Sequence, residues 1–104
     1  MSQTIIKHIV MFDFSPLKPE KTEELVNALI ELSKLNEVLS FEYGTECNHE
    51  DSPLGFTHCF SMTFSNKETR LTYLNSKEHR DYEKKVIPYR TKVLVFDYAI
   101  NKVK

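Results

Sequence analysis

The strictest pattern in the sequence is an alternation of side chains between Phe56 and Phe64. One parity is large and mostly apolar: Phe56, His58, Phe60, Met62 and Phe64. The other parity is small: Thr57, Cys59, Ser61 and Thr63. Successive side chains of a β-strand point to opposite faces, so this segment predicts a strand whose Phe-rich face enters a core. Such a face needs a second layer to cover it, which commits the chain to a layered fold.

Three other segments have the features of strands, and one long stretch has the period of a helix. Residues 4–14 are rich in β-branched and aromatic side chains and are apolar on both parities. Residues 38–46, with Gly44 as a bulge, and residues 92–100 predict two more strands. Residues 20–35 instead predict an amphipathic helix, because leucines recur at i, i+4 and i+7: Leu25, Leu29 and Leu32.

A second helical region follows the third strand in two pieces. Residues 65–68, Ser-Asn-Lys-Glu, form a capping-box pattern that predicts a helix start. The pair Asn75-Ser76 interrupts this helix. Ser76 can then cap a second short helix that continues to Lys85, and Pro88 ends it.

This order of elements predicts an α+β fold of the ferredoxin-like kind, β-α-β-β-α-β, with a four-stranded antiparallel sheet and the helices on one face. At 104 residues, a single domain over residues 1–104 is expected, with its core at about residues 4–100. The sheet face away from the helices carries several apolar side chains: Ile9, Met11, Leu94, Phe96 and Tyr98. We therefore expect a homodimer whose two sheets stack to form an α/β barrel.

Composition excludes several kinds of partner. Fourteen basic and fifteen acidic side chains give a formal net charge of -1, so nucleic acid is not an expected partner. No stretch has the length of a membrane span or the apolar segment of a signal peptide, so a cytoplasmic location is expected. Cys47 and Cys59 are expected to be reduced thiols, and residues 47–55 to form a polar turn with a solvated His49. No glycine-rich phosphate loop is present, and no cofactor is expected.

Three ionisable side chains share the inward faces of the predicted strands. His8 has the parity of Val10, His58 has the parity of Phe60, and Asp97 has the parity of the valines before it. Burial of such groups is costly without a partner, so we expect them to meet each other or a common cavity. The first and third strands are central neighbours in this fold, so His8 and His58 are expected to be adjacent.

The second short helix adds two more candidates. His79 and Tyr82 share one face, and Tyr73 ends the preceding piece. If that face points inward, we expect a cavity that touches both His79 and Tyr73. Histidine suits proton transfer near neutral pH, a tyrosine hydroxyl can donate to a developing oxyanion, and a strand carboxylate can fix an imidazole tautomer. The expected substrate contacts are His8, His58, Val10, Phe60 and Tyr82.

Each candidate also has a structural interpretation. His8 and His58 can be hydrogen-bonded core residues, and His79 can pair at the surface with Glu83, its i+4 neighbour. Asp97 can be an edge carboxylate in water. A metal site from the three histidines and Asp97 lacks a short ligand pair such as H-x-x-x-H, so no metal is expected.

Four motifs resemble the stress-responsive A/B barrel (Dabb) family. They are Lys7-His8-Ile9-Val10, Gly55-Phe56-Thr57-His58, the Y-x5-H element from Tyr73 to His79, and the F-D-Y element at Phe96-Asp97-Tyr98. Their order and spacing follow the family from about residue 6 to residue 98. The resemblance implies a ferredoxin-like protomer and a homodimeric barrel.

One branch of that family, the plant polyketide cyclases, closes a poly-β-keto thioester by an aldol condensation without a cofactor. By resemblance, His79 would be the general base, Tyr73 would hold the carbonyl, and Asp97 would orient His79. His8 and His58 would line the same pocket. The plant cyclases carry large aromatic side chains on the first helix. At the corresponding helix this chain has only aliphatic ones, Leu25, Ala28, Leu29 and Leu32, which implies a cavity of another shape.

Three functions follow as hypotheses. The first is a cofactor-free acid/base enzyme of the cyclase or lyase type that acts on a small carbonyl compound. The second is a non-catalytic stress-related dimer or small-ligand-binding protein. The third is a monooxygenase-like or haem-handling barrel. The fold alone does not separate them, because function depends on the site.

Overall fold

The computed structural model describes residues 4–48 and 54–104. Its four strands form one antiparallel sheet in the order β2-β3-β1-β4. In chain order, the elements are β1 (Ile6–Phe12), α1 (Pro19–Leu32), β2 (Ser40–Thr45), β3 (His58–Phe64), α2 (Lys67–Leu74), α3 (Lys77–Val86), the 3-10 turn η1 (Ile87–Tyr89) and β4 (Val93–Ala99). The predicted ferredoxin-like class is confirmed, with β1 and β3 as the central pair.

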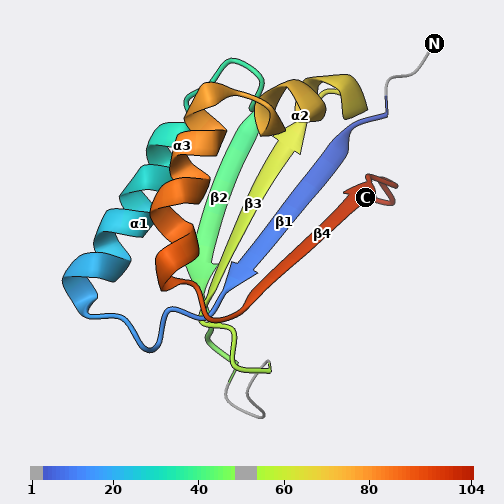
Figure 1. The fold of residues 1–104 in the computed structure, drawn as a ribbon. Helices are drawn as coiled ribbons and strands as arrows, with labels where there is room; N and C mark the ends of the chain where they lie inside the picture. The colour runs from blue at the N-terminus through green and yellow to red at the C-terminus, as the bar shows by residue number, and fades with distance from the viewer. Residues whose placement is uncertain (1–3, 49–53) are drawn as a thin grey trace.

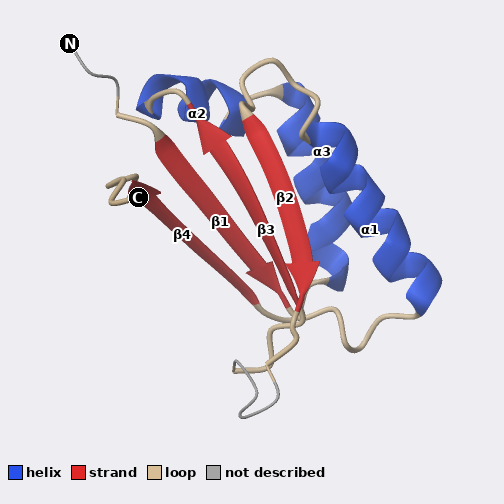
Figure 2. Ribbon diagram, turned by 180° about the vertical axis from the view of Figure 1, so that it is seen from behind, coloured by secondary structure: helices blue, strands red, loops and turns tan. Residues whose placement is uncertain are grey.

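The molecule has two layers. Helices α1 and α3 lie side by side on one face of the sheet, and α2 lies near one end of it (Figure 1). Seen from behind, the strands are in front, and no described element covers them (Figure 2). The shortest principal extent, 17 Å, fits a single sheet with a single layer of helices.

The core lies between these layers and follows the predicted parities. Phe60 and Phe64 of β3 are completely buried, as is Leu25 of α1. Tyr73 of α2 and Val86 of α3 close the same core from the helix side. The alternation along β3 therefore marks its buried face, as the sequence predicts.

Helix α1 ends three residues before the predicted end at residue 35. After Leu32 the backbone tightens, because the amides of Lys34 and Leu35 donate to the carbonyls of Glu31 and Leu32 at i-3. The hydroxyl of Ser33 also donates to the Ile30 carbonyl at 2.6 Å, which competes with the helical pattern.

Two local predictions were wrong. Asn66, not the first residue of the predicted capping box, caps α2, and its side-chain oxygen accepts from the Thr69 amide at 2.7 Å. Gly44 is not a bulge, because it pairs with Cys59 in the regular register of β2 and β3. The cap at Ser76 is confirmed: its hydroxyl accepts from the His79 amide at 3.1 Å. The predicted polar turn and His49 fall mostly or wholly within residues 49–53, outside the described residues.

The open face of the sheet is apolar along its edge. Phe96 of β4 is 59% exposed, and Leu94 and Tyr98 beside it are also exposed. Ile9 and Met11 of the adjacent β1 are half-buried by these neighbours. Within the described part of the chain, no helix has the length and apolar character needed to cross a membrane.

Candidate functional site

A chain of three charged or ionisable side chains joins two strands to a helix. His8 of β1 lies directly opposite Asp97 of β4, and His8 Nδ1 is 2.6 Å from Asp97 Oδ1. The other carboxylate oxygen, Oδ2, accepts from Arg70 Nη1 of α2 at 2.8 Å. The His8 side chain is buried, while those of Asp97 and Arg70 are about a quarter exposed. One carboxylate therefore serves two nitrogen donors, which is how a partly buried acid is retained in a fold.

This contact sets the chemistry of His8. A carboxylate that accepts from the Nδ1–H of a neutral imidazole leaves the lone pair on Nε2. Nδ1 is therefore the structural end of His8, and Nε2 is the end available for proton transfer. The expectation that Asp97 orients His79 was wrong in this structure, because both carboxylate oxygens are engaged elsewhere.

Aromatic rings connect His8 to His79 across the core. The ring of Tyr73 contacts His8 edge-on, with centroids 6.3 Å apart, and contacts His79 in the same way at 5.0 Å. Phe64 packs against both His8 and Tyr73. The ring of Tyr82 follows His79 at 6.4 Å. Both imidazoles thus contact one buried phenol ring.

A cavity of about 210 Å³ lies between strands β1 and β4 and helix α3. Its polar wall includes His8, His79, Tyr82 and Asp97, with Glu83 and Arg90. The rest of its wall is apolar: Val10, Phe12, Leu29, Leu74, Val86, Val93 and Val95. A small, mostly apolar space with a few convergent polar groups is the usual form of a ligand site.

The surroundings of His79 in this wall favour its neutral form. Burial lowers the pKa of His79, and nearby His8 lowers it further, while the charge of Glu83 and a hydrogen bond with the Leu74 backbone oppose the shift. Its Nδ1 atom lies 3.4 Å from Glu83 Oε1, within ion-pair range, but it is buried without a hydrogen-bond partner among the described residues. The surface pair anticipated from the i+4 spacing is therefore present in a partly buried form.

Tyr82 presents a second unsatisfied group. Its hydroxyl is buried without a hydrogen-bond partner among the described residues. Burial raises the pKa of Tyr82, the neighbouring Tyr73 adds to the rise, and the positive charge of Arg90 opposes it. The phenol therefore stays protonated near neutral pH and is available as a hydrogen-bond donor.

His58 lies away from the cavity. The register pairs it with Phe12, while His8 pairs with Met62, four residues along β3. Its Nδ1 is 2.8 Å from the Thr57 hydroxyl, its ring packs on Phe14, and burial lowers its pKa. The predicted adjacency of His8 and His58 was wrong. Neighbouring strands were inferred correctly, but their register was not known.

The cavity also differs from the prediction in two of its walls. Tyr73 touches both imidazoles but does not line this cavity, so this cavity is not the expected space shared by His79 and Tyr73. Phe60 is 1% exposed and belongs to the core instead. Val10 and Tyr82 do line the cavity, together with both imidazoles and the carboxylate.

Two charged residues of this region, Arg70 and Arg90, were missed at the sequence level. Arg70 lies three residues before Tyr73 on α2, and this helical spacing places both on one side of the helix. Glu83 was considered only as a surface partner, and Arg90 follows the predicted end of the helix at Pro88. Helical spacing from Tyr73 is the one signal that would have found Arg70.

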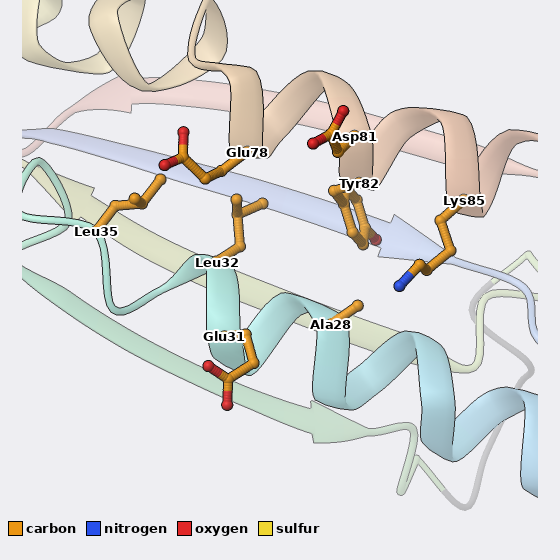
Figure 3. A pocket seen from close by; sticks show the side chains of 8 residues that line it. All are labelled: Ala28, Glu31, Leu32, Leu35, Glu78, Asp81, Tyr82 and Lys85. Carbon is orange, nitrogen blue, oxygen red and sulfur yellow. The ribbon is translucent and has the colours of Figure 1, made fainter.

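A larger groove of about 430 Å³ lies on the outside, between α1 and α3 (Figure 3). Leu32 and Tyr82 extend into it from the two helices, and acidic side chains such as Glu31 and Asp81 lie at its margins (Figure 3). No imidazole lines it, so it offers no group suited to proton transfer near neutral pH. Tyr82 lines both the groove and the cavity.

Within residues 4–48 and 54–104, no group of three or more His, Cys, Asp or Glu side chains is arranged to hold a metal ion. The cavity wall itself offers two imidazoles, a phenol and two carboxylates, with one guanidinium. Two imidazoles with different surroundings can accept and return a proton, and a phenol can hold an oxygen atom.

Comparison with known proteins agrees with this fold. A hydroxynitrile lyase from Passiflora edulis superimposes with a TM-score of 0.89 at 25% identity, over 98% of both chains. A dimeric ferredoxin-like protein of unknown function from Thermobifida fusca has a TM-score of 0.79 at 16% identity, over 96% of this chain and 94% of its own.

Sequence comparison identifies the family. The stress-response A/B barrel domain-containing protein HS1 of Arabidopsis thaliana is 33% identical over 95 residues, which cover 89% of this chain and 87% of the plant protein. The family model described as Stress responsive A/B Barrel Domain matches residues 6–100. Because that match spans nearly the whole chain, this protein belongs to the stress responsive A/B barrel (Dabb) domain family.

Proposed function

We propose that this protein is a cofactor-independent enzyme of the lyase type that moves protons on a small carbonyl compound or its cyanohydrin. The observation that carries the proposal is the cavity lined by both His8 and His79, with Asp97 fixed on the Nδ1 side of His8. This arrangement supplies a base whose orientation is held and a second imidazole that burial favours in its neutral form.

In the proposed reaction, His8 is the general base and Tyr82 binds the substrate oxygen. For a hydroxynitrile, His8 Nε2 would accept the hydroxyl proton while the carbon–cyanide bond breaks. The oxygen becomes a carbonyl, the bonding electrons leave with cyanide, and the imidazolium returns the proton to give hydrogen cyanide. Asp97 stabilises the imidazolium, and the Tyr82 hydroxyl donates to the oxygen on which negative charge develops. His79 is placed to serve as a second proton carrier.

The structural neighbour from Passiflora edulis supports this reaction class, because its name assigns it the cleavage of hydroxynitriles. Cavity size supports a small substrate. At about 210 Å³, the space is below the roughly 300 Å³ at which pockets for drug-sized ligands begin. The aliphatic walls favour a substrate with an apolar part, and the long chain of a polyketide would not fit inside this space.

The test is a rate measurement on two substrate classes, a hydroxynitrile and a β-keto acid. Mandelonitrile releases benzaldehyde, which is followed by its absorbance against the uncatalysed rate in the same buffer. His8→Asn keeps a nitrogen near Asp97 but removes Nε2, and we expect it to lower kcat/KM about a hundredfold or more. The matched control is His58→Asn, which changes a histidine outside the cavity and should leave the rate within about twofold.

Two results would reject the catalytic proposal. One is the absence of any acceleration by the wild-type protein on both classes. The other is an unchanged rate in both His8→Asn and His79→Asn. In either case the second hypothesis, a non-catalytic protein that binds a small ligand, becomes the better one, and thermal-shift screening of the same compounds tests it.

We also propose that the protein acts as a homodimer through the open face of its sheet. Phe96, Leu94 and Tyr98 are exposed there in a row beside Ile9 and Met11. A contiguous apolar face of this kind is characteristic of an interface. The Thermobifida fusca neighbour is described as dimeric, which supports a homodimer.

Light scattering coupled to size-exclusion chromatography tests the dimer. Phe96→Lys places a charge on the open face and should shift the mass from dimer to monomer. Leu71→Lys is the matched control, because Leu71 of α2 is similarly exposed, at 56% against 59%, but lies outside that face. A wild-type monomer, or equal effects of the two substitutions, would contradict this assignment.

A further inference from the structure

The cavity has two ends of different chemistry. Along β1 and β4, the register pairs His8 with Asp97 at one end and Phe12 with Val93 at the other. The first end holds the imidazole and carboxylate, and the second lies at the start of β4, where the chain arrives from Arg90.

Arg90 is the arginine of the cavity wall. The residue follows the 3-10 turn in an extended conformation, and its backbone amide donates to the Val86 carbonyl. The side chain is half-buried and, among the described residues, has neither an ion pair nor a side-chain hydrogen bond. Its charge acts on the Tyr82 hydroxyl, whose pKa it lowers against the effect of burial. Both residues line this cavity of about 210 Å³.

Among the described residues, neither donor side chain forms a hydrogen bond with an acceptor of the wall. The Tyr82 hydroxyl is buried and unpartnered within the described residues, which is costly unless something else accepts its proton. Both oxygens of Asp97 are bound to His8 and Arg70. Glu83 also lines the cavity, but one of its oxygens lies 3.4 Å from His79, and its side chain is 45% exposed. A cation and a phenol without an acceptor together define a place for an anion.

We infer that Arg90 and the Tyr82 hydroxyl form a binding subsite for the carboxylate of a small keto acid or hydroxy acid. With a keto acid or hydroxy acid bound, the carboxylate would accept from the guanidinium and from the phenol, so the Tyr82 hydroxyl would hold the carboxylate instead of the oxygen that it holds in a hydroxynitrile. The carbonyl or hydroxyl carbon would lie on the side of His8 and His79. This inference rests on the proposed function, since it names the substrate class of the same cavity. It also assigns to Arg90 a specificity role that the imidazoles cannot supply.

Binding is measured without turnover, so its outcome is separate from that of the catalytic test. Acetoacetate and acetoacetamide have the same shape, but only the first is an anion at neutral pH. Each is titrated into ¹⁵N-labelled protein, and its Kd is taken from amide shifts. We expect the wild-type protein to bind acetoacetate about tenfold more tightly than acetoacetamide. Arg90→Gln should abolish this preference, and Arg90→Lys should retain part of it.

The matched control is Arg80→Gln. Arg80 belongs to α3 but lies outside the cavity wall, and its guanidinium donates to the Asn75 carbonyl. This variant should keep the full preference for the anion. Tyr82→Phe should weaken the binding of acetoacetate by roughly threefold and should weaken the binding of acetoacetamide less.

The inference is overturned by any of three results. The first is equal binding of both compounds by the wild-type protein, and the second is no binding of either up to its solubility limit. The third is a preference that survives in Arg90→Gln, which would place the anion elsewhere. Each variant is checked for folding by the dispersion of its amide spectrum. If mandelonitrile is cleaved but acetoacetate is not preferred, the catalytic proposal stands and the carboxylate subsite does not.

Discussion

Replacing Asp97 with asparagine tests whether the bridge between His8 and Arg70 stabilises the fold. The substitution keeps the shape of the side chain but removes its charge. The oxygen of an asparagine can still accept from His8. Its amide nitrogen then faces Arg70 Nη1, so two donors meet where Asp97 Oδ2 accepted from Arg70 Nη1 at 2.8 Å. One charge-assisted hydrogen bond is lost, and the buried Arg70 Nε remains without a partner among the described residues.

The expected magnitude follows from the burial of the three side chains. Hydrogen bonds to charged groups contribute about 1.5 to 3 kcal/mol. Because the Asp97 and Arg70 side chains are 25% and 24% exposed, solvent screens part of this, and we expect a loss of about 2 kcal/mol in the free energy of unfolding. For a chain of this size, that corresponds to a Tm lower by roughly 8 °C.

The assay is thermal and urea unfolding followed by circular dichroism at fixed protein concentration. Asp81→Asn is the matched control, because Asp81 also forms a 2.8 Å ion pair, with Lys77, but both side chains are more than half exposed. Its effect on Tm should be much smaller, since exposed pairs are screened by water. Equal shifts in the two variants would refute the view that the bridge is a stabilising element.

Three further outcomes follow from the same structure. Burial lowers the pKa of His79 in the folded protein, so as the pH falls below about 6.5, the ordinary histidine pKa, the unfolded chain binds a proton at this residue before the folded chain does. The free energy of unfolding measured in urea should therefore fall as the pH drops through this region, and it should fall less steeply in His79→Gln. Tyr82→Phe removes a buried hydroxyl without a partner among the described residues, so its Tm should be unchanged or higher, and a clear loss would reveal an unseen partner. Phe60→Ala empties a core position that is 1% exposed and should cost about 3 to 5 kcal/mol in urea unfolding, whereas a loss below about 1 kcal/mol would contradict its core placement.

Periodicity predicted the elements better than their ends. The alternation along β3 and the leucines of α1 identify which faces are buried, because burial is what selects apolar side chains at those spacings. The end of α1 and the cap of α2 depend on which side chain reaches a given amide or carbonyl. Asn66 and its neighbour Ser65 are both good capping residues, so sequence type alone does not choose between them.

The sequence predicted which face of the sheet each candidate side chain occupies, but it did not predict which residues of neighbouring strands lie opposite one another. Parity placed His8, His58 and Asp97 on the helix side of the sheet, and the first and last of these do meet there. Register is set by loop geometry and by the packing of whole strands, and it moves His58 four residues away from the position opposite His8. The partner of Asp97 could not be chosen for the same reason.

The bridge from Arg70 through Asp97 to His8 has a consequence for how this chain can change over evolutionary time. Removing one member leaves the charge or polar group of the others facing a partly buried site, and such losses are not additive. A protein that loses these three residues one substitution at a time is destabilised after the first substitution. Replacing all three together with apolar residues can leave the free energy of unfolding nearly unchanged. We therefore expect the three positions to vary as a unit among descendants of this chain, and relatives that lack the arginine to differ at its partners as well.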